Sequence, residues 1–396
     1  MKALVGAGRI VGAGRIVGAG RIVGLDVARC LALVGMMATH TLAPVDEQGV
    51  TFVQQLAGGR SAALFAVLAG VSIALMSGRT SPVQGRERRA VSVGLAVRAL
   101  LVAAIGLPLG GLGSGIAVIL TYYGLLFLLA LPFLGLRARP LAVLSGIWLL
   151  VVPVLSFLLR PHLPDPSYAS PQFAMLTTPW QLITELTFTG YYPAVPWMAY
   201  LLAGMAIGRM DLTRPRAAVE LIVPGALLAS ASWFLSEALL GRPGVRRTLA
   251  QTYDGPGDPS PLSDLLAHGL FGVTPTGSWE WLAVRAPHSG TPFDLTHTIG
   301  SAMVAIGLCL LLSRLAPRTV AVLFGAGAMT LTLYTAHVLL VASDIWPRDG
   351  VETFLRHVVF AMAVGALFRL RGLRGPLEAG VARTAKVFAD SVRRPG

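Results

Sequence analysis

The sequence contains little charge, almost no lysine and only two cysteines. Only 13% of its 396 residues are charged, whereas a soluble domain carries about 25%, so an ordinary soluble protein is excluded. Lys2 and Lys386 are the only lysines, and arginine therefore carries almost all of the net charge of +13. Cys30 and Cys309 both lie within apolar runs, which excludes a disulfide framework and indicates packing roles.

What the sequence has in excess is apolar residues, at 54% with a mean hydropathy of +0.69. The arginines stand in short loops between apolar runs, a pattern that membrane topology explains better than nucleic-acid binding. We therefore expect an all-α polytopic integral membrane protein that lies in the cell membrane, contacts lipid and binds no nucleic acid.

Ten apolar runs are long enough to cross a bilayer, which requires about 17 to 25 residues. They cover residues 25–42, 58–78, 91–110, 115–135, 140–159, 190–209, 217–239, 295–314, 319–342 and 351–371. Every second connection is rich in arginine, whereas the first connection holds Asp46 and Glu47 and no basic residue before Arg60. The positive-inside rule therefore predicts that both termini are cytoplasmic.

The chain divides into an N-terminal arm (1–23), a transmembrane domain (24–372) and a basic cytoplasmic tail (373–396). The arm repeats Val-Gly-Ala-Gly-Arg-Ile, and its GxG spacings mimic a dinucleotide fingerprint. Because an apolar span follows at once, without the required βαβ unit, we expect a basic arm on anionic lipid instead. The outer connections 160–189 and 240–294 have a length that is typical of functional or disordered loops.

The first span combines a charged pair with a histidine. Asp26 precedes Arg29 by one helical turn, the spacing at which an acid and a base can pair. Arg29 and His40 are eleven positions apart, which places them within ~20° of one helix face and about 16 Å apart along it. Ionisable groups within a membrane helix are costly and by default indicate function.

All seven histidines fall on the predicted outer side of the membrane, and histidine is the usual general base near neutral pH. We expect His40, His337 and His288 to be catalytic. The alternative for His40 is a buried ring bonded to a carbonyl, and the alternative for His288 is a loop-shaping role. The remaining outer rings, His162, His268 and His357, are expected to be structural or solvated.

Other kinds of catalytic site are disfavoured. The histidines and cysteines lack the close spacing of metal ligands, so we expect no metal. The sequence has no GxSxG elbow, which argues against a covalent serine mechanism.

On the predicted inner side, arginine forks are suited to a phosphorylated donor. We assign Arg29, Arg98, Arg79 and Asp26 to donor binding. Arg29 and Arg98 lie within spans, whereas a loop arginine such as Arg79 can also serve only to set topology near anionic lipid.

Several segments resemble a known family of membrane proteins. Arg21-IVGLDVARCLALVGMMATH and Gly59-RSAALFAVLAGVSIAL resemble the start of the heparan-alpha-glucosaminide N-acetyltransferase catalytic domain. Tyr191-YPAVPWMAYLLAGMAIGR-Met210 and Phe324-GAGAMTLTLYTAH-Val338 resemble the related YeiB-like, DUF418-type membrane proteins.

The resemblance implies a transmembrane acyltransferase that moves an acyl group from cytosolic acyl-CoA to a sugar amine or hydroxyl on the other side of the membrane. Acetyl is the leading candidate for the acyl group. It also implies a catalytic histidine at or beyond the outer end of the first helix, where this chain has His40. We expect acyl-CoA to be a co-substrate and an extracytoplasmic glycan or other small acceptor to be a partner. Acceptor binding is assigned to Arg60, Tyr192, Trp197 and His297.

Two other classes remain open. A proton-coupled transporter could use Asp26, Arg29 and the histidines as a proton relay. Transporters often contain repeated groups of membrane spans, however, and the sequence shows no internal repeat beyond the short N-terminal one. A membrane scaffold could use the same charges to fix helix packing. Small residues allow close helix contacts, either within the chain or in a homodimer; they are Gly70, Ala74, Gly204 and Gly208.

Overall fold

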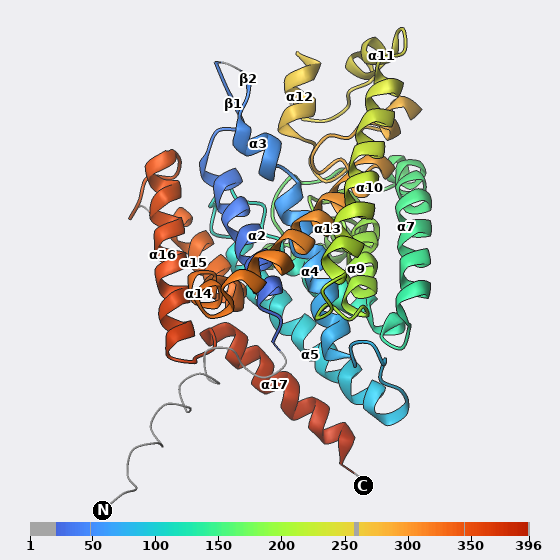
Figure 1. The fold of residues 1–396 in the computed structure, drawn as a ribbon. Coiled ribbons are helices and arrows are strands. Elements are labelled where there is room, and N and C mark those ends of the chain that lie inside the picture. Colours follow the sequence, from blue (N-terminus) through green and yellow to red (C-terminus); the bar gives the residue numbers. More distant parts are fainter. Residues whose placement is uncertain (1–20, 48, 257–260, 344, 395–396) are drawn as a thin grey trace, which may run out of the picture.

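The protein is an all-α bundle with one short β-hairpin (Figure 1). The computed structural model describes residues 21–394 except 48, 257–260 and 344. The predicted arm lies outside this range apart from its last residues, 21–23.

Within the described residues, seven helical segments are long and apolar enough to cross a membrane. They are α2 (Val23–Thr41), α3 with α4 (Phe52–Ala57 and Arg60–Met76), α5 (Gly85–Gly110), α7 with η2 (Ala138–Leu159 and Arg160–His162), α10 (Ala217–Leu240), α13 (Pro292–Leu315) and α16 (Val351–Leu370). Three shorter apolar helices fall on the other predicted spans, namely α6 (Leu120–Leu129), α9 (Ala194–Gly208) and α15 (Thr330–Ala342). The predicted all-α polytopic membrane class is thereby confirmed.

The ninth predicted span, 319–342, is interrupted rather than continuous. It consists of α14 (Pro317–Leu323), the 3-10 turn η6 (Gly325–Ala328) and α15. A Cβ atom on Gly327 would lie 1.8 Å from the carbonyl oxygen of Asp26, and one on Gly325 would lie 2.3 Å from that of Gly365. The break therefore occurs where the backbone passes directly between α2 and α16 and only glycine fits.

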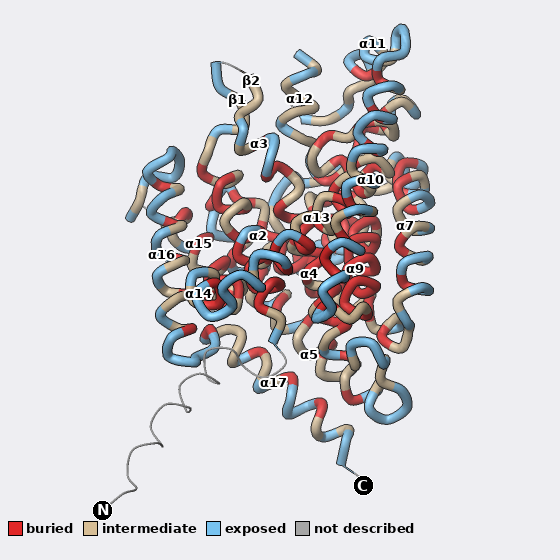
Figure 2. The backbone as a smooth tube through the Cα atoms, in the orientation of Figure 1, coloured by how far each residue is buried: buried red, intermediate tan, exposed pale blue. Residues whose placement is uncertain are grey.

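Helix α9 lies at the centre of the bundle, beside α4 (Figure 2). Nearly all of its residues are buried, as expected for a helix that is apolar on every side. A Cβ atom on Gly204 would lie 1.9 Å from the Val67 carbonyl oxygen, and one on Gly70 would lie 2.2 Å from that of Leu201. The predicted small residues thus bring α4 and α9 together within one chain.

One end of the bundle carries a layer of loops and short elements (Figure 1). It contains β1 (Val45–Asp46) paired with β2 (Gly49–Val50), together with α8 (Pro179–Thr184), η4 (Glu185–Thr189), α11 (Val245–Gln251), α12 (Leu262–His268) and the 3-10 turns η3 (Phe173–Thr177) and η5 (Trp279–Ala283). The loop 240–294 has its own small apolar core around the fully buried Trp281. We call this layer the outer cap, after the side of the membrane on which the positive-inside rule predicts it.

At the opposite end, the predicted basic tail forms the amphipathic helix α17 (Pro376–Arg393). It lies along α5, with Arg393 paired to Glu87 at 2.6 Å. Glu378 accepts hydrogen bonds from the backbone N–H groups of Leu331 and Thr332 at the start of α15, where a carboxylate is favoured by the helix dipole. The remaining short element, η1 (Leu131–Phe133), follows α6.

Candidate functional site: a histidine-lined cavity

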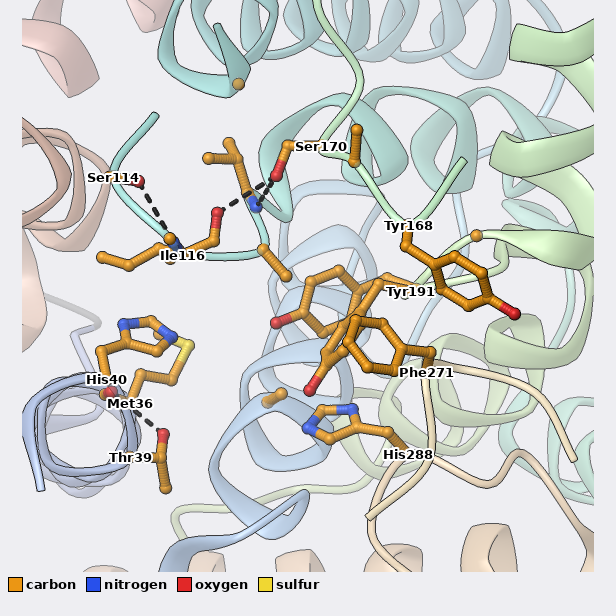
Figure 3. A pocket seen from close by; sticks show the side chains of 18 of the residues that line it. Met36, Thr39, His40, Ser114, Ile116, Tyr168, Ser170, Tyr191, Phe271 and His288 are labelled. Carbon is orange, nitrogen blue, oxygen red and sulfur yellow. Dashed lines mark hydrogen bonds between the residues drawn. The ribbon is translucent and has the colours of Figure 1, made fainter. Parts of the chain in front are cut away.

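A cavity of about 850 Å³ lies between the outer end of α2 and the outer cap. Figure 3 shows Met36, Thr39 and His40 from α2 on one side and Tyr191, Phe271 and His288 on the other. The end of α5 at Gly110 and Gly111, together with residues 113–118 that follow it, lines a further wall. This is why the fourth predicted span begins late: its first residues form cavity wall instead of helix.

Two of the predicted catalytic histidines are in direct contact. The Nδ1 atom of His40 lies 3.1 Å from the Nε2 atom of His337, and the two rings stack with 12° between their planes. His337 is buried in α15, whereas His40 lines the cavity. At this distance one of the two nitrogens carries the shared proton and the other accepts it.

A third ring extends this contact. His357 of α16 meets His337 edge-on, with 4.6 Å between ring centroids, and its Nδ1 atom bonds the carbonyl of Thr353 at 2.9 Å. Among the described residues, His337 Nδ1 and His357 Nε2 have no hydrogen-bond partner. Sequence reasoning had assigned His357 to a structural or solvated role, because nothing in the sequence indicates that α15 and α16 bring these rings together.

His288 faces the same cavity from the outer cap. Its ring is held by aromatic neighbours, with centroids at 4.7 Å from Tyr191, 5.6 Å from Tyr192 and 6.5 Å from Trp197. Burial, with a smaller contribution from His40, lowers the pKa of His288 to about 4. The ring is therefore neutral at pH 7.

The backbone at His288 is strained. Its φ of 56° lies in the left-handed region, which a non-glycine residue adopts at a cost. Tyr168, which lines the cavity as well, has the same φ of 56°. Strain of this kind is found where a side chain must be aimed at a site.

A buried carboxylate that sequence reasoning missed also lines the cavity. Glu185 lies in the π-helical segment η4 and is only 1% exposed. Its Oε1 atom accepts hydrogen bonds from Ser167 N and Gln181 Nε2, whereas among the described residues its Oε2 atom has no partner. The π-turn, a feature frequent at functional sites, is visible only in the structure.

At the other end of α2, the predicted ion pair is confirmed. Arg29 Nη1 lies 3.0 Å from Asp26 Oδ1, and Arg29 Nη2 donates to Ser72 Oγ at 2.9 Å. Arg21 Nε lies 2.5 Å from the second oxygen of Asp26. Asp26 is buried among these charges, about 21 Å along the helix from His40.

The other two residues assigned to donor binding lie apart from this cluster. Arg98 of α5 faces the charges of Glu378 and Arg374. The carbonyl of Arg79 accepts a hydrogen bond from Arg209, whose buried guanidinium also binds the carbonyls of Ala74, Ser77, Leu134 and Leu136. The backbone of Arg79 thus belongs to a structural clamp at the inner ends of α4 and α9.

The four residues assigned to acceptor binding fall into two groups. Tyr192 lines the cavity, and Trp197 packs behind it against Tyr192 and His288. Arg60 instead binds His297, with 3.0 Å between Nη2 and Nε2, and neither belongs to the described cavity lining. The other ring nitrogen of His297 lies 3.0 Å from the carbonyl of Ala229. This pair joins α4, α13 and α10 beside the site.

Together these features define a polytopic membrane protein with a histidine-lined cavity, suited to proton transfer, at one end of a helix and buried charge at the other. The family model described as heparan-alpha-glucosaminide N-acetyltransferase, catalytic, matches residues 21–240, more than half of the chain. The chain belongs to this family, which indicates a transmembrane acetyltransferase-type function. A search of curated proteins gives no match. The similarity of residues 324–338 to YeiB-like proteins lies outside the matched range and stays a prediction.

Proposed function

We propose that the protein transfers an acyl group, with acetyl as the leading candidate, from cytosolic acyl-CoA to an amine or hydroxyl of a sugar on the extracytoplasmic side. The observation that carries this proposal is the His40–His337 pair, because it presents a hydrogen-bonded imidazole to a cavity large enough for a small acceptor.

The His40–His337 contact supports a role for His40 as general base. When His40 Nδ1–H donates to His337 Nε2, the Nε2 atom of His40 keeps its lone pair and can take a proton from the acceptor. His337 is then a positioning residue, which holds His40 in the basic tautomer, as an orienting partner does for other catalytic histidines.

The transfer step balances without a further reactant. The acceptor amine or hydroxyl attacks the thioester carbonyl, so that the new N–C or O–C bond forms and the C–S bond breaks. His40 takes the proton lost by the acceptor and returns it to the departing thiolate, which leaves as free CoA. Glu185 Oε2, buried and unpartnered among the described residues, is suited to orient the acceptor by accepting an N–H or O–H hydrogen bond.

On the inner side, Arg29 and Arg21 are the groups we assign to the CoA phosphates. Both guanidiniums already contact Asp26, so Asp26 orients them before the anion binds. Arg98 of α5, which lies apart from this cluster near Glu378 and Arg374, is a second candidate.

The test is release of free thiol from acetyl-CoA by the purified protein in lipid vesicles, with glucosamine as acceptor. We expect His40→Ala to abolish release and His337→Gln to lower kcat by about 10²-fold, the scale of a general base contribution. His162→Ala is the matched control because that ring is exposed and lies outside the cavity. Turnover that is unchanged in His40→Ala would contradict the assignment.

One observation favours a transporter as a second candidate, namely the interrupted ninth span. Broken helices at membrane depth are typical of transporters, in which they line the substrate path. Here the interruption is filled by close contact with α2 and α16. The same assay discriminates between the two, because a transporter releases no free CoA.

A further inference from the structure

A second cavity, of about 440 Å³, adjoins the histidine-lined cavity within the outer cap. Four residues line both cavities: Pro166, Tyr168, Thr189 and Phe271. The volume of the second cavity falls within the ~300–1,000 Å³ range of small-molecule sites. An acceptor at His40 that consists of more than one sugar unit can therefore extend from the first cavity into the second.

The junction between the two cavities is polar and strained. Thr189 Oγ1 is buried and, among the described residues, has no hydrogen-bond partner. Tyr168 has its left-handed backbone conformation at this junction, and its ring packs edge-on against that of Phe271 with 5.2 Å between ring centroids. The structure thus holds an aromatic edge and an unsatisfied hydroxyl at the point where a bound chain would pass.

The walls of the second cavity combine aromatic faces with oxygen acceptors. Tyr253 and Tyr168 supply rings, and Asp165 and Asp254 supply carboxylates. Asp165 is exposed and lines the cavity, and Asp254 accepts hydrogen bonds from Thr276 N and Oγ1 at 3.2 Å each. Sugars present apolar C–H faces and hydroxyl donors, and this lining offers a partner to each.

Charge narrows the class of sugar. Two carboxylates line this cavity beside one guanidinium, that of Arg160, and Arg160 already binds both the carbonyl and the hydroxyl of Thr274. A sulfated or carboxylated unit would face the carboxylates at close range, which is unfavourable, whereas a neutral or amino sugar would not. The residues of this wall from 253 to 276 also lie beyond the range matched by the family model.

We infer that the second cavity is a subsite for the next unit of a neutral or amino-sugar chain whose terminal residue is acylated at His40. This inference rests on the proposed function. The acceptor is then an oligosaccharide, held by Tyr253 and Asp165 beyond the reacting unit and bent across Tyr168 and Phe271.

The experiment compares glucosamine with its β-1,4-linked dimer and trimer as acceptors for thiol release from acetyl-CoA. We expect kcat/KM to rise about tenfold from monomer to dimer, the ratio that one or two net hydrogen bonds supply, and to rise no further with the trimer. Tyr253→Ala and Asp165→Asn should remove this advantage while the rate with glucosamine is unchanged. Asp264→Asn, in the same outer cap but outside both described linings, is the control and should retain it.

Equal kcat/KM values for monomer and dimer, or variants that keep the advantage, would overturn the subsite. Absence of thiol release with every acceptor would instead contradict the proposed function. In that case, calorimetric titration of the vesicle-bound protein with the trimer tests the cavity independently. Binding that is weakened about tenfold by Tyr253→Ala supports the subsite, and binding that is absent or unaffected rejects it.

Discussion

At the scale of single residues, the site consists of histidine rings and a buried carboxylate gathered from distant parts of the chain. His40, His288 and Glu185 line one cavity although they come from α2, the loop between η5 and α13, and η4. His337 contributes from behind through its contact with His40. Proton transfer requires partners that lie within hydrogen-bond reach of one another and of the substrate. The His40–His337 pair meets the first of these two requirements.

His288 makes the stability of the outer cap depend on pH. Its pKa is about 4 in the folded protein, against 6.5 in an unfolded chain. As the pH falls below 6.5, the unfolded state binds a proton that the folded state does not, so stability is lost between pH 6.5 and pH 4. At pH 5 the expected loss is at most about 2 kcal/mol, because one pKa unit corresponds to about 1.4 kcal/mol and the ring is partly open to the cavity.

The measurement is the melting temperature of the detergent-solubilised protein at pH 7.5 and pH 5. We expect His288→Asn to reduce the drop seen in the parent protein, and asparagine is chosen because it tolerates the left-handed backbone. His162→Asn, at an exposed ring, should melt like the parent at both values. An identical drop in His288→Asn and the parent would refute this explanation.

At the scale of helices, close backbone contact determines the arrangement. Gly204 on α9 meets Val67 on α4, and Gly327 in η6 meets Asp26 on α2. The second contact supports the helix segment that carries the buried ion pair. Helix packing in membranes depends on such small residues because apolar burial alone does not distinguish a helix from lipid.

Gly204→Ala should therefore destabilise the bundle. The new Cβ atom would lie 1.9 Å from the Val67 carbonyl oxygen, and neither backbone can move without separating α4 from α9. We expect a loss of about 3 kcal/mol, as for strong overpacking, measured as a lower melting temperature. Gly146→Ala in α7 is the matched control, because no other part of the described chain beyond its own helical turn lies within 4 Å of the new Cβ, and it should gain about 0.5–1 kcal/mol of helix stability. Equal melting temperatures for the two variants would contradict the packing argument.

The sequence predicted most of the elements and part of the site, for identifiable reasons. Long apolar runs located the helices, and the spacing of Asp26 and Arg29 predicted their ion pair, because both signals are local in the chain. The interruption at Gly325 and Gly327 was missed, since it depends on the backbones of α2 and α16. Glu185 was missed, and the contact of His357 with His337 was not anticipated, for the same reason: both depend on neighbours that are distant in sequence.

At the scale of the whole molecule, the two ends of the bundle differ in chemistry. The outer cap lines one side of the first cavity and contains the second, whereas α17 and the connection from α4 to α5, near Arg79, Arg86, Arg88 and Arg89, lie at the opposite end (Figure 1). The positive-inside rule predicts that the arginine-rich end is cytoplasmic. The proposed transfer requires this orientation, because acyl-CoA is cytosolic and the cavity must face the acceptor.

Single cysteines can test the orientation directly. Ser263→Cys in α12 and Ser391→Cys in α17 place a thiol on an exposed position at each end. The native Cys30 and Cys309 are buried, so their reaction with a membrane-impermeant maleimide should be negligible. In intact cells we expect labelling of Ser263→Cys alone, and after permeabilisation we expect labelling of both variants. Labelling of Ser391→Cys in intact cells would place α17 outside, and the donor would then have to reach Arg29 from the side that also holds the acceptor, which the proposed mechanism does not allow.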